Sequence, residues 1–184
     1  MTTVCIVRHG ETDWNALKKF QGREDIELKE RGKEQAAAAA EYLSKSSWDV
    51  IISSPLKRAS MTAHIIRSRI GLTNINTCNS FIERDFGKAS GLTLQQQREV
   101  FPDGIIPGKE DDYVLQDRII KGLDMILQKY CGKNIILVSH GAVINSLIKA
   151  VSNNSIDIGE TKIKNTCINI IKNIQGQWNI VEFN

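Results

Sequence analysis

The sequence is short of cysteine pairs and of long apolar segments, and each shortage excludes a class of protein. Its four cysteines form no C-x-x-C pair, so they indicate neither a zinc site nor a disulfide framework. No stretch approaches the roughly 20 apolar residues that a membrane helix requires. The apolar run near the beginning, at residues 4–7, is too short for a signal peptide. We therefore expect a cytoplasmic protein that has no membrane partner.

An excess of one charge is also missing. The formal net charge is only +3, and lysine and arginine alternate with aspartate and glutamate along the chain. This pattern argues against nucleic acid as a partner. The chain also lacks the G-x-x-x-x-G-K-[ST] and G-x-G-x-x-G loops that cradle the phosphates of nucleoside triphosphates and dinucleotides.

The length and composition are those of an ordinary globular protein. With 184 residues, 41% of them hydrophobic and 24% charged, the chain has enough apolar residues for a substantial core. We expect one domain that spans residues 1–184. Nothing in the composition favours a homodimer over a monomer.

Short apolar runs alternate along the chain with segments rich in helix-forming residues. The apolar, β-branched runs predict buried strands at residues 4–7, 49–54 and 134–139, and a weaker strand is expected at residues 75–78. Helix formers and apolar residues at helical spacing predict helices at residues 28–46, 55–70, 93–100, 113–130 and 141–151. In the second of these helices, Ser54 is the expected N-cap and Pro55 the first helical residue.

Two further segments complete the expected architecture. Alternation over residues 164–173 and a last apolar run at residues 178–183 resemble a hairpin. Residues 101–112 contain two prolines and two glycines and are expected to form a loop or a lid. Strands that alternate with helices predict an α/β fold, a three-layer α/β/α sandwich with a mostly parallel central sheet.

Two of the three histidines directly follow a predicted strand and precede a glycine. They are His9 and His140. Because ligands bind beyond the carboxyl ends of parallel strands, we expect both imidazoles to point into one crevice. The third histidine, His64, lies within a predicted helix and is expected to have only a structural role.

Two arginines are expected close to these histidines. Arg8 precedes His9, and Arg58 lies near the beginning of a predicted helix that follows a strand. Guanidinium groups match phosphate oxygens, and a helix N-terminus adds oriented N–H groups. The set predicts a phosphate pocket with in-line attack by one imidazole. His9 is the preferred nucleophile, because Arg8 adjoins it and Asn15 is close enough in sequence to donate another hydrogen bond.

A leaving alkoxide requires a proton, so the pocket also needs a carboxyl group. Glu83 is the preferred candidate, because it lies in a glycine-bounded loop after a predicted strand. Asp85, two residues further on, is also compatible with the spacing. Lys109 and Arg84 are expected near the mouth of the pocket, where they would favour a second anionic group on the substrate.

Several blocks spread over nearly the whole chain match one known family. They are Arg8-His9-Gly10-Glu11-Thr12 with Trp14-Asn15, Phe20-Gln21-Gly22, Ser53-Ser54-Pro55-Leu56-Lys57-Arg58-Ala59 with Thr62-Ala63, Glu83-Arg84-Asp85-Phe86-Gly87 with Gly91-Leu92, and Ser139-His140-Gly141. In these blocks the sequence resembles the histidine phosphatase superfamily, also called phosphoglycerate mutase-like, and in particular its phosphatases. One departure is Glu27, where the family often has a proline before the leucine.

The resemblance implies a phosphohistidine intermediate on His9 and a role for Glu83 as general acid and base. It also implies that the chain needs no cofactor and no metal. The implied phosphate-binding residues are Arg8, Asn15, Gln21, Gly22, Arg58, His140 and Gly141.

Four functions compete on this basis. We favour a phosphomonoesterase that acts on a small phosphorylated metabolite, such as a sugar phosphate, a phosphoglycerate or a nucleoside-type phosphate. A cofactor-dependent phosphoglycerate mutase would use the same pocket, but mutases of the family are usually longer. A non-catalytic module that binds phosphorylated ligands would not need all the reactive groups together. A metal hydrolase with His9 and His140 as ligands is the weakest alternative, because the neighbouring arginines would repel the ion.

Overall fold

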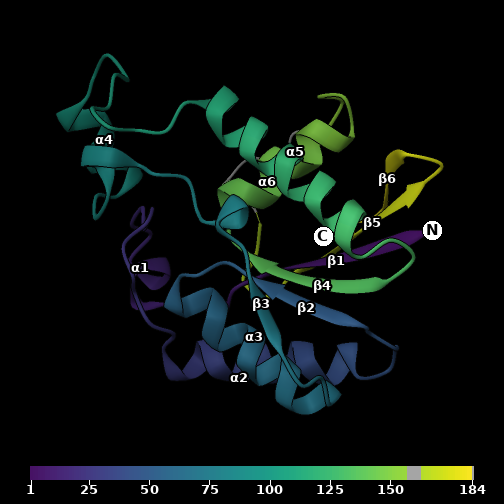
Figure 1. Cartoon of the computed structure of the whole chain (residues 1–184). Helices are drawn as coiled ribbons and strands as arrows, with labels where there is room; N and C mark the ends of the chain where they lie inside the picture. Colours follow the sequence, from purple (N-terminus) through teal and green to yellow (C-terminus); the bar gives the residue numbers. More distant parts are fainter. Residues whose placement is uncertain (157–162, 184) are drawn as a thin grey trace.

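The computed structural model describes residues 1–156 and 163–183, which contain a six-stranded sheet (Figure 1). The strands are β1 (Thr2–Arg8), β2 (Val50–Ser53), β3 (Ile75–Thr77), β4 (Asn134–Ser139), β5 (Ile168–Ile174) and β6 (Gln177–Glu182). They lie in the order β3-β2-β4-β1-β5-β6. The first four strands pair in parallel, whereas β5 pairs antiparallel with both β1 and β6. The expected mostly parallel sheet is confirmed.

Helices cover both faces of this sheet. The α-helices are α1 (Asp13–Ala16), α2 (Glu30–Leu43), α3 (Lys57–Ile70), α4 (Leu94–Val100), α5 (Asp112–Lys129) and α6 (Gly141–Val151), and short 3-10 helices are η1 (Asn79–Phe81) and η2 (Gly87–Ala89). Figure 1 shows α2 and α3 on one face and α5 and α6 on the other, which confirms the three layers. None of the described helices combines the length and the apolar character needed to cross a membrane.

Alternate side chains of the central strands enter two separate cores. In β1, Val4 and Ile6 pack with residues of α5 and α6, whereas Cys5 and Val7 pack with residues of α2 and α3. Successive side chains of a strand point to opposite faces, so a strand covered on both sides reads as a continuous apolar run. This burial on both faces fixes the carboxyl end of β1, where His9 follows.

One predicted boundary is wrong. The helix α3 begins at Lys57, with Leu56 as the N-cap, and not at Ser54-Pro55. Leu56 has extended backbone angles, and the Ser54 hydroxyl lies 2.7 Å from Nε2 of His140 instead of capping the helix. Arg58 is consequently the second residue of α3, in the first turn.

Other elements agree with the sequence patterns to within a few residues. The ends of β4 and α6 are as predicted, and the antiparallel pairing of β5 with β6 confirms the C-terminal hairpin. The strand β1 begins earlier than expected, at Thr2. The four-residue helix α1 was not predicted, because it is too short to show apolar periodicity. A capping box between Thr12 and Asn15 holds it.

Two glycines bring the loop after β1 into backbone contact with α2. A Cβ on Gly10 would lie 2.2 Å from the carbonyl oxygen of Gly32, and a Cβ on Gly32 would lie 2.1 Å from that of Glu11. The amide of Gly10 also donates to Oγ1 of Thr62 on α3, at 3.0 Å. The loop that carries His9 therefore rests directly on both helices of that layer.

We expect Gly32→Ala to lower the free energy of unfolding by about 1–3 kcal/mol, the usual cost of overpacking. The loss should occur although alanine is the better helix former. Glu34→Ala, at an exposed position of the same helix, is the matched control and should change stability by less than about 0.5 kcal/mol. Urea unfolding followed by circular dichroism measures both variants. If Gly32→Ala is as stable as the control, the close backbone contact between Gly32 and the loop after β1 does not contribute to stability.

Candidate active site

A cavity of about 1020 Å³ opens beyond the carboxyl ends of β1 and β4, on the side of the sheet where α1 and α4 lie (Figure 1). Seven of the nine site residues predicted from the sequence line it, namely Arg8, His9, Asn15, Gln21, Arg58, Glu83 and Gly141. His140 and Gly22 are not part of the lining. The cavity thus collects groups that come from distant parts of the chain.

His9 is held in a defined orientation at the end of β1. Its backbone amide donates to the carbonyl of Ser139 at 3.0 Å, so the ends of β1 and β4 are joined there. The Nδ1 atom lies 2.7 Å from the carbonyl oxygen of Gly10. Because a carbonyl only accepts hydrogen bonds, the proton of the neutral ring belongs on Nδ1. The lone pair is then on Nε2, which is the nitrogen available for attack.

His140 is the N-cap residue of α6 and lies beside His9, with 5.2 Å between the ring centroids. Its side chain is fully buried and does not line the cavity. Nε2 interacts with the hydroxyl of Ser54, whereas Nδ1 has no hydrogen-bond partner among the described residues. A buried polar atom without a partner is costly, so Nδ1 is a candidate for contact with a bound ligand.

Main-chain carbonyls hold both arginines. Arg58 is fully buried, and its two terminal nitrogens donate to the carbonyls of Glu24 and Gly22, each at 2.7 Å. Arg8 donates through Nη1 to the carbonyl of Ile163. Within the described parts of the chain, the Nε atoms of both arginines are buried and lack a partner. Two unpartnered cationic donors at one cavity are suited to an anion.

The charges of these groups influence one another. Burial lowers the pKa of the Arg58 guanidinium to about 10, with Arg8 acting in the same direction and Glu83 opposing both. Burial also lowers the pKa of His9 well below its ordinary value, and the positive charges of Arg58 and Arg8 lower it further. The pKa of His140 is lowered well below the ordinary value for the same reasons, burial first. Both imidazoles are therefore neutral.

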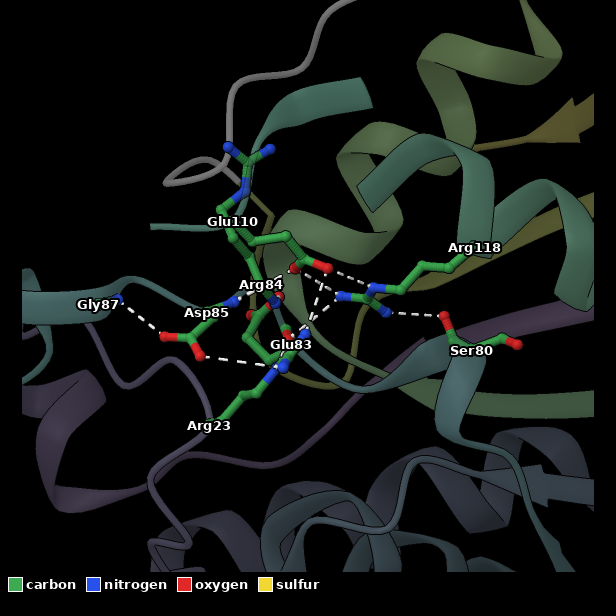
Figure 2. A network of polar contacts seen from close by, with 8 residues as sticks. All are labelled: Arg23, Ser80, Glu83, Arg84, Asp85, Gly87, Glu110 and Arg118. Carbon is green, nitrogen blue, oxygen red and sulfur yellow. Dashed lines mark hydrogen bonds and ion pairs between the residues drawn. The ribbon is translucent and has the colours of Figure 1, made fainter. Parts of the chain in front are cut away.

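The carboxylate of Glu83 reaches the cavity from the loop between η1 and η2. Its Oε1 accepts from the amide of Arg84 at 2.9 Å, and its Oε2 lies 3.5 Å from the amide of Ala142. Asp85 does not line the cavity, and its Oδ1 accepts from the amide of Gly87 at 2.8 Å (Figure 2). Of the two carboxylates that the sequence left open, the geometry favours Glu83.

Asn15, Gln21 and Gly22 play different parts, whereas Gly141 lines the cavity at the first residue of α6. Asn15 lines the cavity, and its Oδ1 accepts from the amide of Thr12 at 3.1 Å, which leaves the side-chain NH₂ as the group that faces a ligand. Gln21 also lines the cavity and is almost fully buried. Gly22 does not line it and instead accepts from Arg58. Its φ of +55° suits glycine.

Residues 101–112, expected to form a loop or a lid, form a loop outside the lining of the cavity. None of these residues lines it, because the loop pairs with residues 85–88: Lys88 donates to the carbonyl of Pro107 at 3.0 Å, and Glu110 to that of Asp85 at 2.8 Å. Arg84 and Lys109 are also absent from the lining, and Arg84 pairs with Asp112. The predicted place of Arg84 and Lys109 at the mouth is therefore wrong.

Sequence reasoning missed the contribution of residues 163–165. Asn165 donates through Nδ2 to the carbonyl of His9 at 2.9 Å and to Oδ1 of Asn15 at 3.3 Å, and Lys164 lines the cavity. Lys18 lines it from the loop after α1. The alternation over residues 164–173 predicts a strand but gives no sign of a site, since these positions reach the cavity only through the pairing of β5 with β1.

In the described part of the chain, no group of three or more histidine, cysteine, aspartate or glutamate side chains is arranged to hold a metal ion. Besides the carboxylates of Glu83 and Glu11, the lining carries cationic side chains and neutral hydrogen-bond donors, among them Arg8, Arg58 and Asn15. The chemistry of this donor set matches a tetrahedral oxyanion.

Comparison with known proteins agrees with this arrangement. The model of the histidine phosphatase superfamily (branch 1) matches residues 4–184. The chain is 40% identical over 184 residues to the uncharacterized phosphatase PhoE of Bacillus subtilis (strain 168), covering 100% of this chain and 95% of that protein. It is 31% identical over 191 residues to a metal-independent phosphoserine phosphatase of Arabidopsis thaliana, covering 97% and 79%. The chain belongs to the histidine phosphatase superfamily.

Solved structures show the same fold. A mutant phosphoserine phosphatase from Entamoeba histolytica, in complex with phosphoserine, superposes with a TM-score of 0.84 at 28% identity, covering 100% of this chain and 97% of that chain. A structure of phosphoserine phosphatase from the same organism, in complex with 3-phosphoglyceric acid, has a TM-score of 0.83 at 29% identity with the same coverage. Both similar proteins bind a small phosphorylated metabolite.

We expect neither His9 nor His140 to take up a proton near pH 6.5, the ordinary value. Unfolded imidazoles become charged as the pH falls through 6.5, whereas the folded ones stay neutral until the pH reaches their lowered pKa. The free energy of unfolding should therefore decrease below pH 6.5, by up to about 1.4 kcal/mol per pH unit for each imidazole.

Imidazole ¹⁵N NMR resolves the protonation state, and urea unfolding at several pH values measures the slope. His140→Asn, which cannot take a proton, should reduce that slope by about half. Protonation of His9 in the folded protein at pH 6.5 would contradict the neutral nucleophile.

Proposed function

We propose that this protein is a phosphomonoesterase that hydrolyses a small phosphorylated metabolite through a phosphohistidine on His9. The observation that supports this most strongly is the convergence on one cavity of a neutral imidazole with a free Nε2, two buried guanidinium groups and one carboxylate. The match of the family model to residues 4–184 supports one domain for this activity.

In the proposed first step, Nε2 of His9 attacks phosphorus in line with the ester oxygen. The guanidinium groups of Arg8 and Arg58, which line the cavity, hold the other phosphate oxygens, and His140, which is buried beside His9, assists them. The N-terminus of α6, at Gly141 in the lining, adds a positive dipole. The protonated carboxyl group of Glu83 gives its proton to the leaving alcohol as the phosphorus–oxygen bond breaks. The products of this step are the alcohol and phosphohistidine.

In the second step, the Glu83 carboxylate takes a proton from water as the water oxygen attacks phosphorus. The phosphorus–nitrogen bond breaks, inorganic phosphate leaves and His9 is neutral again. The amide of Arg84 accounts for one of the hydrogen bonds that keep the carboxylate in place during both steps.

Neither step requires a metal or a cofactor. The charge stabilisation that a metal supplies in other phosphatases comes here from Arg8 and Arg58, which would repel a cation. The similarity to a metal-independent phosphoserine phosphatase supports this part of the proposal.

The first experiment is an acid-free denaturing quench of turnover with a ³²P-labelled phosphomonoester in the presence of EDTA. We expect an acid-labile phosphoryl group on the wild-type protein and none on His9→Ala. The activity of His9→Ala should be lower than that of the wild type by a factor of about 10⁴ or more, as expected when a nucleophile is lost. The exposed His64 provides the control, because His64→Ala should keep the label.

Other outcomes distinguish the alternatives. If no phosphate is released from any of a broad panel of phosphomonoesters, the protein is a binding module. If 3-phosphoglycerate, with catalytic bisphosphoglycerate, gives 2-phosphoglycerate faster than free phosphate, the protein is a mutase. If EDTA abolishes turnover, the metal-independent mechanism is wrong.

We also propose that the substrate carries a second anionic group. The lysines Lys18 and Lys164 line the cavity and are exposed, whereas Lys19, also in the lining, lies 5.7 Å from the Trp14 ring. The acidic Glu11 in the lining is paired with Lys29, so it does not cancel their charge. The complexes of similar proteins with phosphoserine and 3-phosphoglyceric acid support a substrate that carries a carboxylate as its second anion.

We expect Lys164→Ala to raise KM for 3-phosphoglycerate about fivefold, which corresponds to roughly 1 kcal/mol for an exposed ion pair. KM for p-nitrophenyl phosphate, which has no second anion, should not change. Lys109→Ala removes a lysine outside the cavity and is the matched control. Equal effects of Lys164→Ala on the two substrates would refute the second anionic group.

A further inference from the structure

A network of buried and half-buried charges surrounds the backbone of Glu83 (Figure 2). At its centre, the carboxylate of Glu110 pairs with both nitrogens of the Arg118 fork, at 2.7 Å and 2.9 Å. Arg23 adds a contact to the same carboxylate at 3.2 Å. The Glu110 side chain is only 6% exposed, and none of the three residues lines the cavity.

Both arginines also donate to the main-chain carbonyl of Glu83. Nη2 of Arg118 lies 3.2 Å from this oxygen, and Nε of Arg23 lies 3.4 Å from it. Nη1 of Arg118 donates to the carbonyl of Ser80 at 2.8 Å. Two guanidinium groups therefore converge on the backbone of the residue whose side chain enters the active site.

The segment that they hold has no regular secondary structure of its own. Residues 82–85 lie between η1 and η2, outside the sheet and the helices. Glu110 completes the attachment, because its amide donates to the carbonyl of Asp85 at 2.8 Å and its Oε2 accepts from the amide of Asp85 at 3.3 Å. The polar backbone groups that a strand would use are thus satisfied by side chains and by a neighbouring loop.

The close packing of α5 against η1 brings Arg118 within hydrogen-bond distance of the carbonyls of Ser80 and Glu83. One turn further along this helix, a Cβ on Gly122 would lie 2.8 Å from Ser80 and from Phe81, so glycine lets the helix approach η1 closely.

Burial raises the pKa of Glu110, but the hydrogen bond and charge of Arg118, the amide of Asp85 and the charge of Arg23 outweigh it and lower the pKa overall. Glu110 is therefore an anion that holds two cations in fixed positions.

We propose that Glu110 and Arg118, assisted by Arg23, are positioning residues that set the location of the Glu83 carboxyl group relative to the phosphate. The inference rests on the proposed function, in which Glu83 donates the proton to the leaving group. Displacement of the Glu83 backbone moves its carboxyl group away from the ester oxygen, and proton transfer is sensitive to such distances. The phosphate-binding groups are attached to the ends of β1 and β4 and to α3, so they are not displaced with it.

The test compares kcat/KM for two kinds of ester, because this constant reports the steps up to phosphorylation of His9. An alkyl ester (the best of phosphoserine, 3-phosphoglycerate and glycerol phosphate) needs a proton on its leaving group. Dinitrophenyl phosphate does not, because dinitrophenolate is a stable anion. For Glu110→Ala we expect a loss of about tenfold or more on the alkyl ester and of less than about twofold on dinitrophenyl phosphate.

Arg118→Lys is the second variant, because it keeps the positive charge but cannot contact Ser80, Glu83 and Glu110 together. Arg118→Lys should show the same selective loss on the alkyl ester. If thermal unfolding shows that Glu110→Ala is not folded at the assay temperature, the conclusion is drawn from Arg118→Lys alone. Glu41→Ala is the matched control. It removes the partner of Arg69 from another Glu–Arg pair, which lies on the surface between α2 and α3, and should leave both substrates unaffected.

Glu83→Gln separates the failure of this inference from that of the proposed function. We expect it to lose much more on the alkyl ester than on dinitrophenyl phosphate, and Glu110→Ala to add no further loss in that background. If Glu83→Gln shows the selective loss and the variants Glu110→Ala and Arg118→Lys slow both esters equally, the positioning role is overturned and the proposed function stands. If Glu83→Gln itself is not selective, or no alkyl ester is hydrolysed, both are overturned.

Discussion

The positive charge of two guanidinium groups at the end of the sheet governs the rest of the site. Arg58 is fully buried and Arg8 is largely so, and each lies within the electrostatic field of the other. Three main-chain carbonyls hold their terminal nitrogens and leave the Nε donors without partners among the described residues. Burial first, and then the same positive charge, lower the pKa of His9 and of His140. The guanidinium groups thus favour an anion in the cavity and, together with burial, keep both imidazoles neutral.

The sequence predicted the parts of the fold that depend on strong local patterns. The strand β4 and the helix α6 have the predicted ends, because a continuous apolar run followed by His140-Gly141 leaves little choice of boundary. Seven of nine predicted site residues line the cavity for a similar reason, since groups that follow parallel strands meet at one edge of the sheet. The motif blocks predicted membership of the histidine phosphatase superfamily, and the match of the family model confirms it.

The failures arose where tertiary contacts decide the position of a residue. Ser54 looked like an N-cap in the sequence, but its hydroxyl is engaged by His140, which is 86 residues away. Arg84 looked like a substrate contact but faces Asp112. Asn165 showed no signal at all, because only the antiparallel pairing of β5 with β1 brings it to His9. Local patterns contain no information about such contacts.

The site combines two ways of fixing a reactive group. His9 and His140 follow strands whose backbone hydrogen bonds and two cores define their position. Glu83 follows no strand, and side chains from α5 and from the loop after Gly22 hold its backbone instead. The two parts of the site meet at one loop, because the carbonyls of Gly22 and Glu24, on either side of Arg23, hold the guanidinium group of Arg58.

The backbone contacts around His9 also impose an order on the assembly of the site. Thr166 donates its amide to the carbonyl of Arg8 at 3.0 Å, and Asn165 donates to that of His9, across a separation of 156 residues. The surroundings of His9 are therefore complete only when two segments that lie 156 residues apart in the sequence have come together. A chain in which β5 has not yet paired with β1 lacks both of these hydrogen bonds at Arg8 and His9.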